Sequence, residues 1–343
     1  MKPNIFEIAT KELHQYAFIT WLLQYADDKY KSSDILMNEC GKDFVSELIR
    51  KHIPEFNEEI TKVEAGRQWE NIDVWAEVND KYLIIIEDKI NTIHHSNQLY
   101  RYKTIAEEWC TKHNYNKPIC IYLKTRNESQ ETLTKAKKEG FEIFNRQDFT
   151  GILSKHEKSD NDIFKDFYQR LIRIEKSNNE FESRIIAEWK GSDWEGFFQF
   201  LEKEIGLIGW NYVNNPNGGF WNAVLNWEYW GDYPVYIQTE EGKLCFKIST
   251  DPEEDIEIPN NSSRGQIRNE FSNIVINNAN DLGIANIRKP DRFGNGKYMT
   301  VAIVEQENWL GESNSTIDKG KVIETLKKYK VFLTTIVLPI INE

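Results

Sequence analysis

The sequence IIIEDKI, residues 84–90, joins a short apolar run to three consecutive charged residues. The isoleucines are typical of a buried β-strand, because β-branched side chains pack well on a pleated surface. Side chains alternate along a strand, so Glu87 and Lys89 share one face and Asp88 points to the other. A solvated strand end with Glu–Lys pairing is one interpretation. Burial of the flanking isoleucines favours a built site instead, since a buried charge needs a partner.

A second strand precedes this run. The sequence NIDVWAEV, residues 71–78, alternates apolar and polar residues, and the Asn-Asp pair after it favours a turn. The two strands are therefore expected to form a hairpin. With a three-residue loop, Asp73 lies directly across from Glu87; with a two-residue loop it faces Ile86, and the carboxylates fall on opposite faces. A site that uses both carboxylates thus requires a three-residue loop or a bulge.

Two carboxylates a few ångströms apart repel each other, and each raises the pKa of the other. A divalent cation removes this cost, and carboxylate and carbonyl oxygens are the hard ligands that Mg²⁺ or Mn²⁺ prefers. Asp73 and Glu87 are therefore candidate metal ligands, together with the backbone carbonyl of Asp88. A lysine beside such a cation can orient a water molecule and stabilise charge during attack on a phosphodiester. Lys89 is the candidate for this role.

The pattern D…(D/E)xK on adjacent strands resembles that of the PD-(D/E)XK nucleases, with Asp73 and the run Glu87–Lys89 in the motif positions. The family core is a helix, a sheet that contains a β-hairpin, a helix and a further strand, and the chain up to about Lys124 follows this order. The resemblance implies an α/β, restriction-endonuclease-like core, a mixed sheet flanked by helices. It also implies hydrolysis of nucleic acid, with DNA expected, using Mg²⁺ or Mn²⁺. No proline precedes Asp73, a departure that is common in the family.

Two further elements carry the resemblance. The sequence QLYRY places Gln98 and Tyr102 four residues apart on an expected helix, similar to the QxxxY motif of the λ-exonuclease-like branch. There the pair lines the active site, so these residues are expected to orient the scissile strand or the motif lysine; a simple surface pair is the alternative. Glu12 corresponds to an acidic residue that helps hold metal in many relatives, although a carboxylate in a first helical turn also favours the helix dipole. Glu64 is a weaker candidate for that role.

The composition changes near residues 175–183, EKSNNEFES, and we place a domain boundary close to Ser177. Residues 1–176 are expected to form the nuclease-like domain. Residues 177–343 are expected to form an α+β domain, rich in aromatic residues, with seven of the 11 tryptophans and a recognition or regulatory role. The first part should contain helices near residues 10–26, 42–52, 96–110, 132–139 and 162–176, and strands near residues 60–67, 72–78, 81–90, 117–125 and 141–145. The second part should contain an antiparallel meander over residues 209–248, helices near residues 182–205, 264–282 and 318–330, and a strand at residues 297–305.

Bulk composition limits the classes of function. Hydrophobic residues make up 40% of the 343 residues and charged residues 29%, which is ordinary for a globular protein. The net charge of −12 argues against binding nucleic acid by bulk attraction, so a local patch or bound cations must carry such binding. The four cysteines show no metal-binding spacing and suit a reducing cytosol. We expect a cytoplasmic protein without a signal peptide or membrane span, and the oligomeric state stays open.

The resemblance is closest to a bacterial group of these nucleases that is often associated with defence against phage. Two other classes of function stay open. The chain could be a catalytically silent nuclease fold that only binds nucleic acid or a partner protein, although the intact Asp73, Glu87 and Lys89 pattern argues against this. It could also be a sensor in which the second domain binds a ligand and gates the first.

Overall fold

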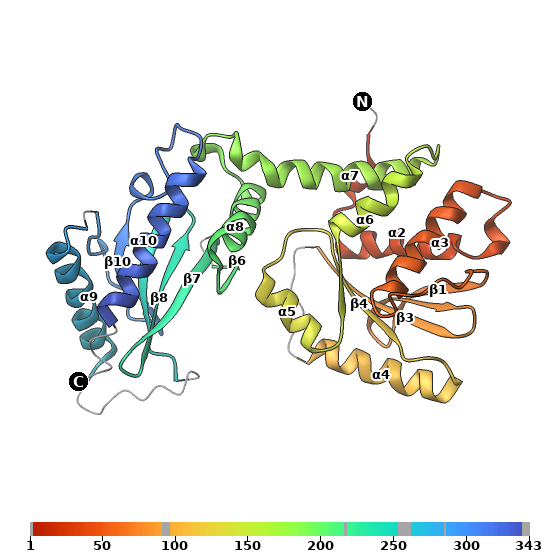
Figure 1. The fold of residues 1–343 in the computed structure, drawn as a ribbon, viewed down its shortest axis with the longest axis horizontal. Helices are drawn as coiled ribbons and strands as arrows, with labels where there is room; N and C mark the ends of the chain where they lie inside the picture. Colours follow the sequence, from red (N-terminus) through yellow and green to blue (C-terminus); the bar gives the residue numbers. More distant parts are fainter. Residues whose placement is uncertain (1–2, 91–96, 216–217, 253–261, 285, 338–343) are drawn as a thin grey trace. The chain divides into compact units, whose positions relative to one another are not determined.

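The chain divides into two compact units, Met1–Lys176 and Ser177–Glu343, each with its own five-stranded sheet and hydrophobic core (Figure 1). The protein is known from a computed structural model, which describes residues 3–90, 97–215, 218–252, 262–284 and 286–337.

The first unit is a mixed sheet with helices on both faces. Its elements in chain order are α1 (Ile5–Ile8), α2 (Glu12–Tyr25), α3 (Ile35–Arg50), β1 (Val63–Trp69), β2 (Ile72–Val78), β3 (Tyr82–Lys89), α4 (Gln98–His113), β4 (Ile119–Lys124), α5 (Gln130–Lys138), β5 (Glu142–Asn145), α6 (Arg146–Leu153) and α7 (Asp162–Asn179). The strand order is β1-β2-β3-β4-β5, with antiparallel pairing up to β3 and parallel pairing from β3 to β5. The expected mixed sheet flanked by helices is thus confirmed.

The central strand β3 is buried along its whole length because helices cover both faces of the sheet. Ile84 and Ile86 belong to the core that α2, α3, α6 and α7 share on one face. Leu83 and Ile85 belong to a second core on the other face, where α4 and α5 pack (Figure 1). The charged end of β3 therefore stands between two apolar layers, which is the setting that the isoleucine run indicated.

The hairpin between β2 and β3 has the register that a shared carboxylate site requires. Val78 pairs with Tyr82 and Val74 with Ile86, so the loop holds three residues. The loop residues at positions 79 and 80 have φ angles of 52° and 54°. Asn and Asp occupy these positions and tolerate this left-handed conformation better than most residues with a side chain.

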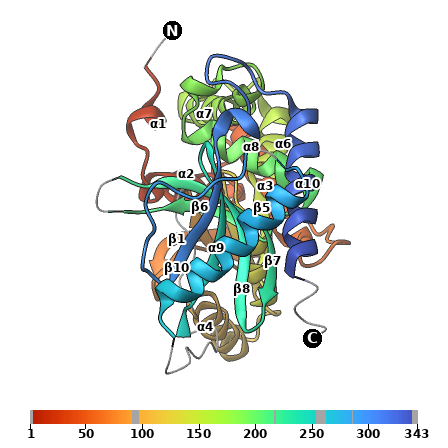
Figure 2. The same ribbon diagram turned by 90° about the vertical axis from the view of Figure 1, so that its left-hand side faces the viewer.

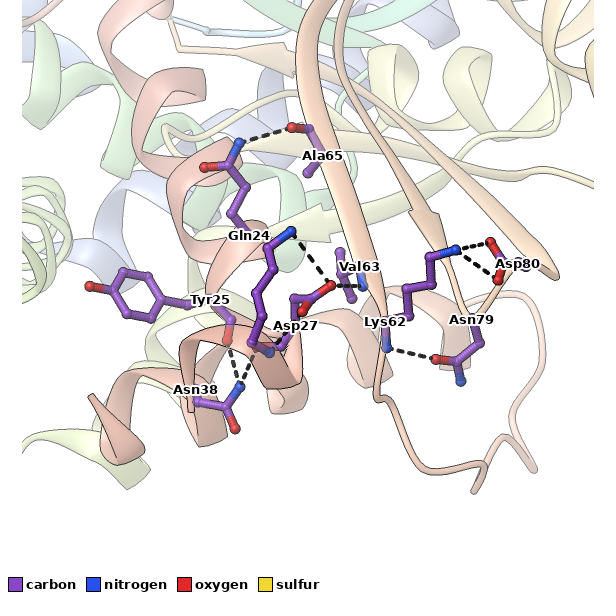
Figure 3. Close-up of polar contacts among 10 residues, drawn as sticks. Gln24, Tyr25, Asp27, Asn38, Lys62, Val63, Ala65, Asn79 and Asp80 are labelled. Atoms are coloured by element: carbon purple, nitrogen blue, oxygen red, sulfur yellow. Dashed lines mark hydrogen bonds and ion pairs between the residues drawn. The ribbon is translucent and has the colours of Figure 1, made fainter. Parts of the chain in front are cut away.

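The loop end of the hairpin is fastened to the strand and helix beside it (Figure 3). The Asn79 side chain accepts a hydrogen bond from the Lys62 backbone N–H at 3.2 Å, and Lys62 forms an ion pair with Asp80 at 2.7 Å. The Asp27 carboxylate, at the end of α2, accepts a hydrogen bond from Val63 N–H at 2.9 Å. These contacts hold β1 and α2 at one end of the sheet, while the charged residues of β3 lie at its other end.

Three helices of the first unit differ from the sequence expectation, and one of them is the short helix α1, which was not expected. Helix α3 begins at Ile35, well before residue 42, because the Asp34 side chain caps it by accepting a backbone hydrogen bond. Helix α6 was not expected. It begins with a capping box in which Asn145 and Asp148 each accept a hydrogen bond from the backbone of the other.

The second unit is an antiparallel sheet with helices, and this confirms its expected α+β architecture. Its elements are α8 (Gly191–Ile205), β6 (Gly209–Val213), β7 (Phe220–Trp230), β8 (Tyr233–Glu240), β9 (Lys243–Ser249), α9 (Arg264–Asp281), β10 (Tyr298–Val304) and α10 (Lys319–Val337). The strand order is β10-β9-β8-β7-β6. Helix α9 packs along β10, and α10 packs against β7 and β8 (Figure 2). In the described parts of both units, no helix combines the length and apolarity needed to cross a membrane.

Candidate active site

Two carboxylates from adjacent strands meet on the α4 face of the first sheet. The pairing of Val74 with Ile86 places Asp73 directly across from Glu87, on the same face. The two carboxyl groups are close enough for the charge of Asp73 to raise the pKa of Glu87. Glu87 is only 1% exposed, whereas Asp73 is half-buried, so one carboxylate is shielded from water and the other keeps part of its surface exposed.

Lys89 and the QxxxY pair surround the Glu87 carboxylate. The Lys89 ammonium lies 2.6 Å from Glu87 Oε1. From the first turn of α4, Gln98 Nε2 donates to the same oxygen at 2.8 Å and lies 3.1 Å from the Tyr102 hydroxyl. Helix α4 therefore brings both motif residues to the carboxylate pair. The residues just before α4, positions 91–96, lie outside the described residues; they include Ser96, which the sequence makes a candidate cap of this helix.

Asp88 points to the opposite face of β3. Its carboxylate accepts a hydrogen bond from Gln15 Nε2 of α2 at 2.6 Å, and Thr125 Oγ1 donates to Gln15 Oε1 at 2.8 Å. The Asp88 backbone N–H donates to Asp73 Oδ2 at 3.0 Å. Complete burial raises the pKa of Asp88 well above its usual range, although the hydrogen bond from Gln15 opposes this. The side chain of Asp88 thus anchors α2, and only its backbone is on the side of the carboxylate pair.

Glu12 reaches the cluster from the start of α2. Its Oε1 accepts a hydrogen bond from the backbone N–H of Ile90 at 3.0 Å, and its charge contributes to the raised pKa of Asp73 and of Glu87. Glu64, the competing candidate, is exposed on β1 and pairs in register with Glu77, away from the carboxylate pair. The structure therefore brings Glu12 to the cluster and leaves Glu64 outside it.

The cluster contains more negative than positive charge. Burial, followed by the charge of Asp73, raises the pKa of Glu87 to about 7. The pKa of Asp73 is also raised, mainly by burial. Burial lowers the pKa of Lys89, but the charges of Glu87, Asp73 and Glu12 outweigh it, and the pKa is raised overall. Three carboxylates therefore share one ammonium group among these residues, and an added cation would relieve their repulsion.

The donor set fits a hard divalent cation. No group of three or more His, Cys, Asp or Glu side chains in the described ranges stands ready to hold a metal ion. Mg²⁺, however, commonly takes only one or two carboxylates and completes its shell with water and substrate phosphate. Glu87 Oε2 is buried and has no hydrogen-bond partner among the described residues, which leaves it available as a ligand beside Asp73. The pair therefore matches the chemistry of Mg²⁺ or Mn²⁺.

Sequence reasoning missed several residues around the cluster. Gln15 and Thr125 gave no signal, because their contacts join distant parts of the chain. Tyr16 follows Glu12 by one helical turn, and burial, then the charge of Asp73, raises its pKa. The Tyr16 hydroxyl accepts a weak hydrogen bond from Gln68 Nε2 at 3.4 Å. The helical spacing from Glu12 was the one available signal for Tyr16.

Comparison with known families agrees with this geometry. Residues 3–162 match the PD-(D/E)XK nuclease superfamily. The match includes every residue of the cluster and most of the first unit. Members of the superfamily are generally nucleases, which are hydrolases, and they typically use divalent metal ions. No curated protein and no solved structure is significantly similar to the chain.

Proposed function

We propose that the first unit is a metal-dependent nuclease that hydrolyses phosphodiester bonds, with DNA as the expected substrate. The observation that carries the proposal is the meeting of Asp73 and Glu87 on one sheet face with the Lys89 ammonium 2.6 Å from Glu87. The superfamily match over the same residues supports it.

Each residue of the cluster has a separate role in this proposal. Asp73 and Glu87 hold Mg²⁺ or Mn²⁺, with the Asp88 carbonyl as a further ligand and Glu12 assisting through water. The ion, when bound, supplies positive charge that acidifies a water and neutralises the phosphate. The Lys89 ammonium positions the attacking water and stabilises the charge that develops on the phosphate oxygens.

The QxxxY pair acts on the geometry of this cluster. Gln98 fixes the rotamer of Glu87 through its 2.8 Å hydrogen bond, and Tyr102 lies against Gln98 from the next turn of α4. A carboxylate that is held in place before substrate arrives loses little freedom on binding the cation. In the presence of substrate, Gln98 can also donate a hydrogen bond to the scissile strand.

The second unit has a recognition or regulatory role in this proposal. Residues 177–343 carry 25 Asp and Glu against 16 Lys and Arg, whereas residues 1–176 carry 30 against 27. The second unit is thus the more acidic one and does not attract a phosphate backbone by its net charge. We assign it to a partner or a trigger, and a role in phage defence rests on the resemblance alone. The four cysteines, all free and buried, fit the reducing cytosol that we expect.

Cleavage assays on the full chain test the proposal. Circular DNA, linear DNA and RNA are incubated with the protein in Mg²⁺, in Mn²⁺ or in EDTA, alongside a Lys89→Ala variant. Lys81→Ala is the matched control, because Lys81 lies in the loop just before β3, far along the strand from Lys89, and pairs with the exposed Glu58. We expect the wild type and Lys81→Ala to cut in metal and Lys89→Ala not to cut. A wild type that binds nucleic acid in EDTA but never cuts would support the silent binding module instead.

A further inference from the structure

Three tryptophans form an open cleft on the same sheet face as the carboxylate pair. The cleft has a volume of about 60 Å³, is open to solvent and is lined by Trp69, Trp75, Glu77, Leu83 and Trp109. All three indoles are half-buried, so each keeps part of its surface exposed. Trp69 and Trp109 meet edge to face with ring centroids 6.1 Å apart.

The walls of this tryptophan cleft are fixed by further contacts. Trp109 packs edge to face on Tyr115 at 4.8 Å, and the Tyr115 hydroxyl donates to Glu77 Oε2 at 2.9 Å. Trp75 lies against the backbone of Gly66 on β1, where a Cβ atom would stand only 2.7 Å from the indole ring. Glycine therefore permits this close approach, and the position of the indole is set before any ligand arrives.

An unusual backbone conformation turns Trp69 into the cleft. Regular alternation along β1 would place Trp69 with Val63 and Ala65 on the α2 face. It packs instead with the core on the α4 face, beside Trp109. The preceding residue, Gln68, has a φ of 56°, which is unfavourable for a residue with a side chain. Such local strain is held in place by its surroundings and is concentrated at functional sites.

The cleft lies next to the carboxylate pair along β2. Trp75 follows Asp73 by two residues on the same face of β2, a distance of about 7 Å along the strand. A stacked nucleic-acid strand advances about 3.4 Å per nucleotide. A strand whose scissile phosphate lies at Asp73 therefore carries a base to the cleft within one or two nucleotides of the cut.

The lining selects a base rather than a phosphate or an apolar peptide. Indole faces stack on any base. Glu77 repels phosphate, but it can accept a hydrogen bond from an exocyclic amino group, as carboxylates do from cytosine. No described residue donates a hydrogen bond to its Oε1. An apolar peptide would bury this carboxylate without a donor, which is unfavourable.

We propose that the tryptophan cleft binds an unstacked base of the substrate, one or two nucleotides from the scissile phosphate. The proposal rests on the proposed nuclease function and names its substrate class: nucleic acid that is single-stranded, or locally unpaired, beside the cut. Base stacking also explains how a chain with a net charge of −12 binds its substrate without bulk attraction.

Binding measurements in EDTA separate stacking from simple apolar packing. Fluorescein-labelled single-stranded DNA is titrated with the full-length protein and followed by anisotropy. Trp75→Phe keeps an aromatic face at this position, whereas Trp75→Leu keeps only apolar bulk. We expect Trp75→Leu to weaken binding about 5- to 100-fold and Trp75→Phe to bind nearly as well as the wild type. Tyr30→Leu, which removes an exposed aromatic residue elsewhere in the first unit, is the control and should have no effect. Melting temperatures establish that each variant is folded.

Abasic substrates then locate the bound base. One base at a time is removed near the mapped cut, or along the whole oligonucleotide if nothing is cut. Removal of the base at one particular position should weaken binding to the wild type by the same factor as the Trp75→Leu substitution does. Removal of that base should not weaken binding to the Trp75→Leu variant any further, because the contact is already lost. Two results would overturn the base site: equal DNA affinity of Trp75→Leu and the wild type, or effects of base removal and of Trp75→Leu that add at every position. Neither result would affect the nuclease proposal, which is tested by Lys89-dependent cleavage. A wild type that cuts nothing but shows this coupling would overturn the nuclease proposal and keep the base site.

Discussion

Replacing Glu87 with glutamine tests whether the buried carboxylate is kept for a cation. The amide has nearly the same shape, and its oxygen can still accept hydrogen bonds from Lys89 and Gln98. Glu87 has a pKa raised from 4.5 to about 7, and this value already includes its favourable pairing with Lys89. One pKa unit corresponds to about 1.4 kcal/mol, so the ionised Glu87 destabilises the fold by about 3 kcal/mol above pH 7 without metal.

The sign of the pH dependence follows from this shift. Between about pH 4.5 and 7 the folded protein binds more protons at Glu87 than the unfolded chain does, so stability falls as pH rises. The Glu87→Gln variant does not show this fall in stability, because glutamine does not ionise. In EDTA we therefore expect it to match the wild type near pH 4 and to exceed it by up to about 3 kcal/mol near pH 8. Urea unfolding of the full chain and hydrogen exchange of the β3 amides measure the difference.

Adding Mg²⁺ should make the wild type more stable than the Glu87→Gln variant. A ligand present at 1,000 times its Kd stabilises the folded state by about 4.1 kcal/mol, which exceeds the deficit of about 3 kcal/mol, and only the wild type keeps both carboxylates. Glu58→Gln is the control, because Glu58 is exposed and Lys81 and Tyr82 lower its pKa. Its substitution should therefore change stability with pH in the opposite direction and to a smaller extent. It should not alter the response of stability to Mg²⁺. A Glu87→Gln protein that is less stable than the wild type at pH 8 in EDTA, or equally stabilised by Mg²⁺, would refute the reasoning.

Three further changes test separate parts of the cluster. Lys89→Ala should lower the single-turnover cleavage rate by about 10²–10³, the loss seen when one preorganised electrostatic group is removed; its melting temperature establishes that the variant is folded, and full activity would remove its assignment. Asp73→Ala should abolish cleavage and also weaken Mg²⁺ binding in calorimetry, and unchanged metal affinity would count against its role as a ligand. Gln15→Ala should destabilise the fold by about 1–3 kcal/mol, because it leaves the Asp88 carboxylate buried without its partner; urea unfolding checks this, and an unchanged midpoint would contradict the anchoring role of Asp88.

The sequence was most informative where a periodic pattern met a chemical constraint. The strand pattern around Glu87 predicted the hairpin, and the need to place Asp73 on the same face required the three-residue loop that the register has. The four-residue spacing of Gln98 and Tyr102 similarly predicted a pair on one helix face. In these cases the relevant residues are close in the chain, so local geometry determines which side chains share a face.

Other features could not be derived from such patterns. Gln15 contacts Asp88, which is 73 positions away in the chain, and Thr125, which is 110 positions away. No periodicity in the sequence encodes contacts between residues so far apart. The left-handed conformation of Gln68 reverses the regular alternation along β1, so alternation alone does not give the face on which Trp69 lies. Helix α6 was missed although its capping residues were visible, because the segment is short and follows a strand directly.

The link through Gln15 also bears on when the site can form during synthesis. Gln15 joins β3 to the segment after β4, and Thr125 completes this link from 110 residues further along the chain. A growing chain emerges from the ribosome in order, so Glu12 and Gln15 are exposed long before their partners exist. Contacts between such distant residues also form slowly, since a long loop must close first. A nascent chain therefore lacks the complete arrangement until most of the first unit has been made.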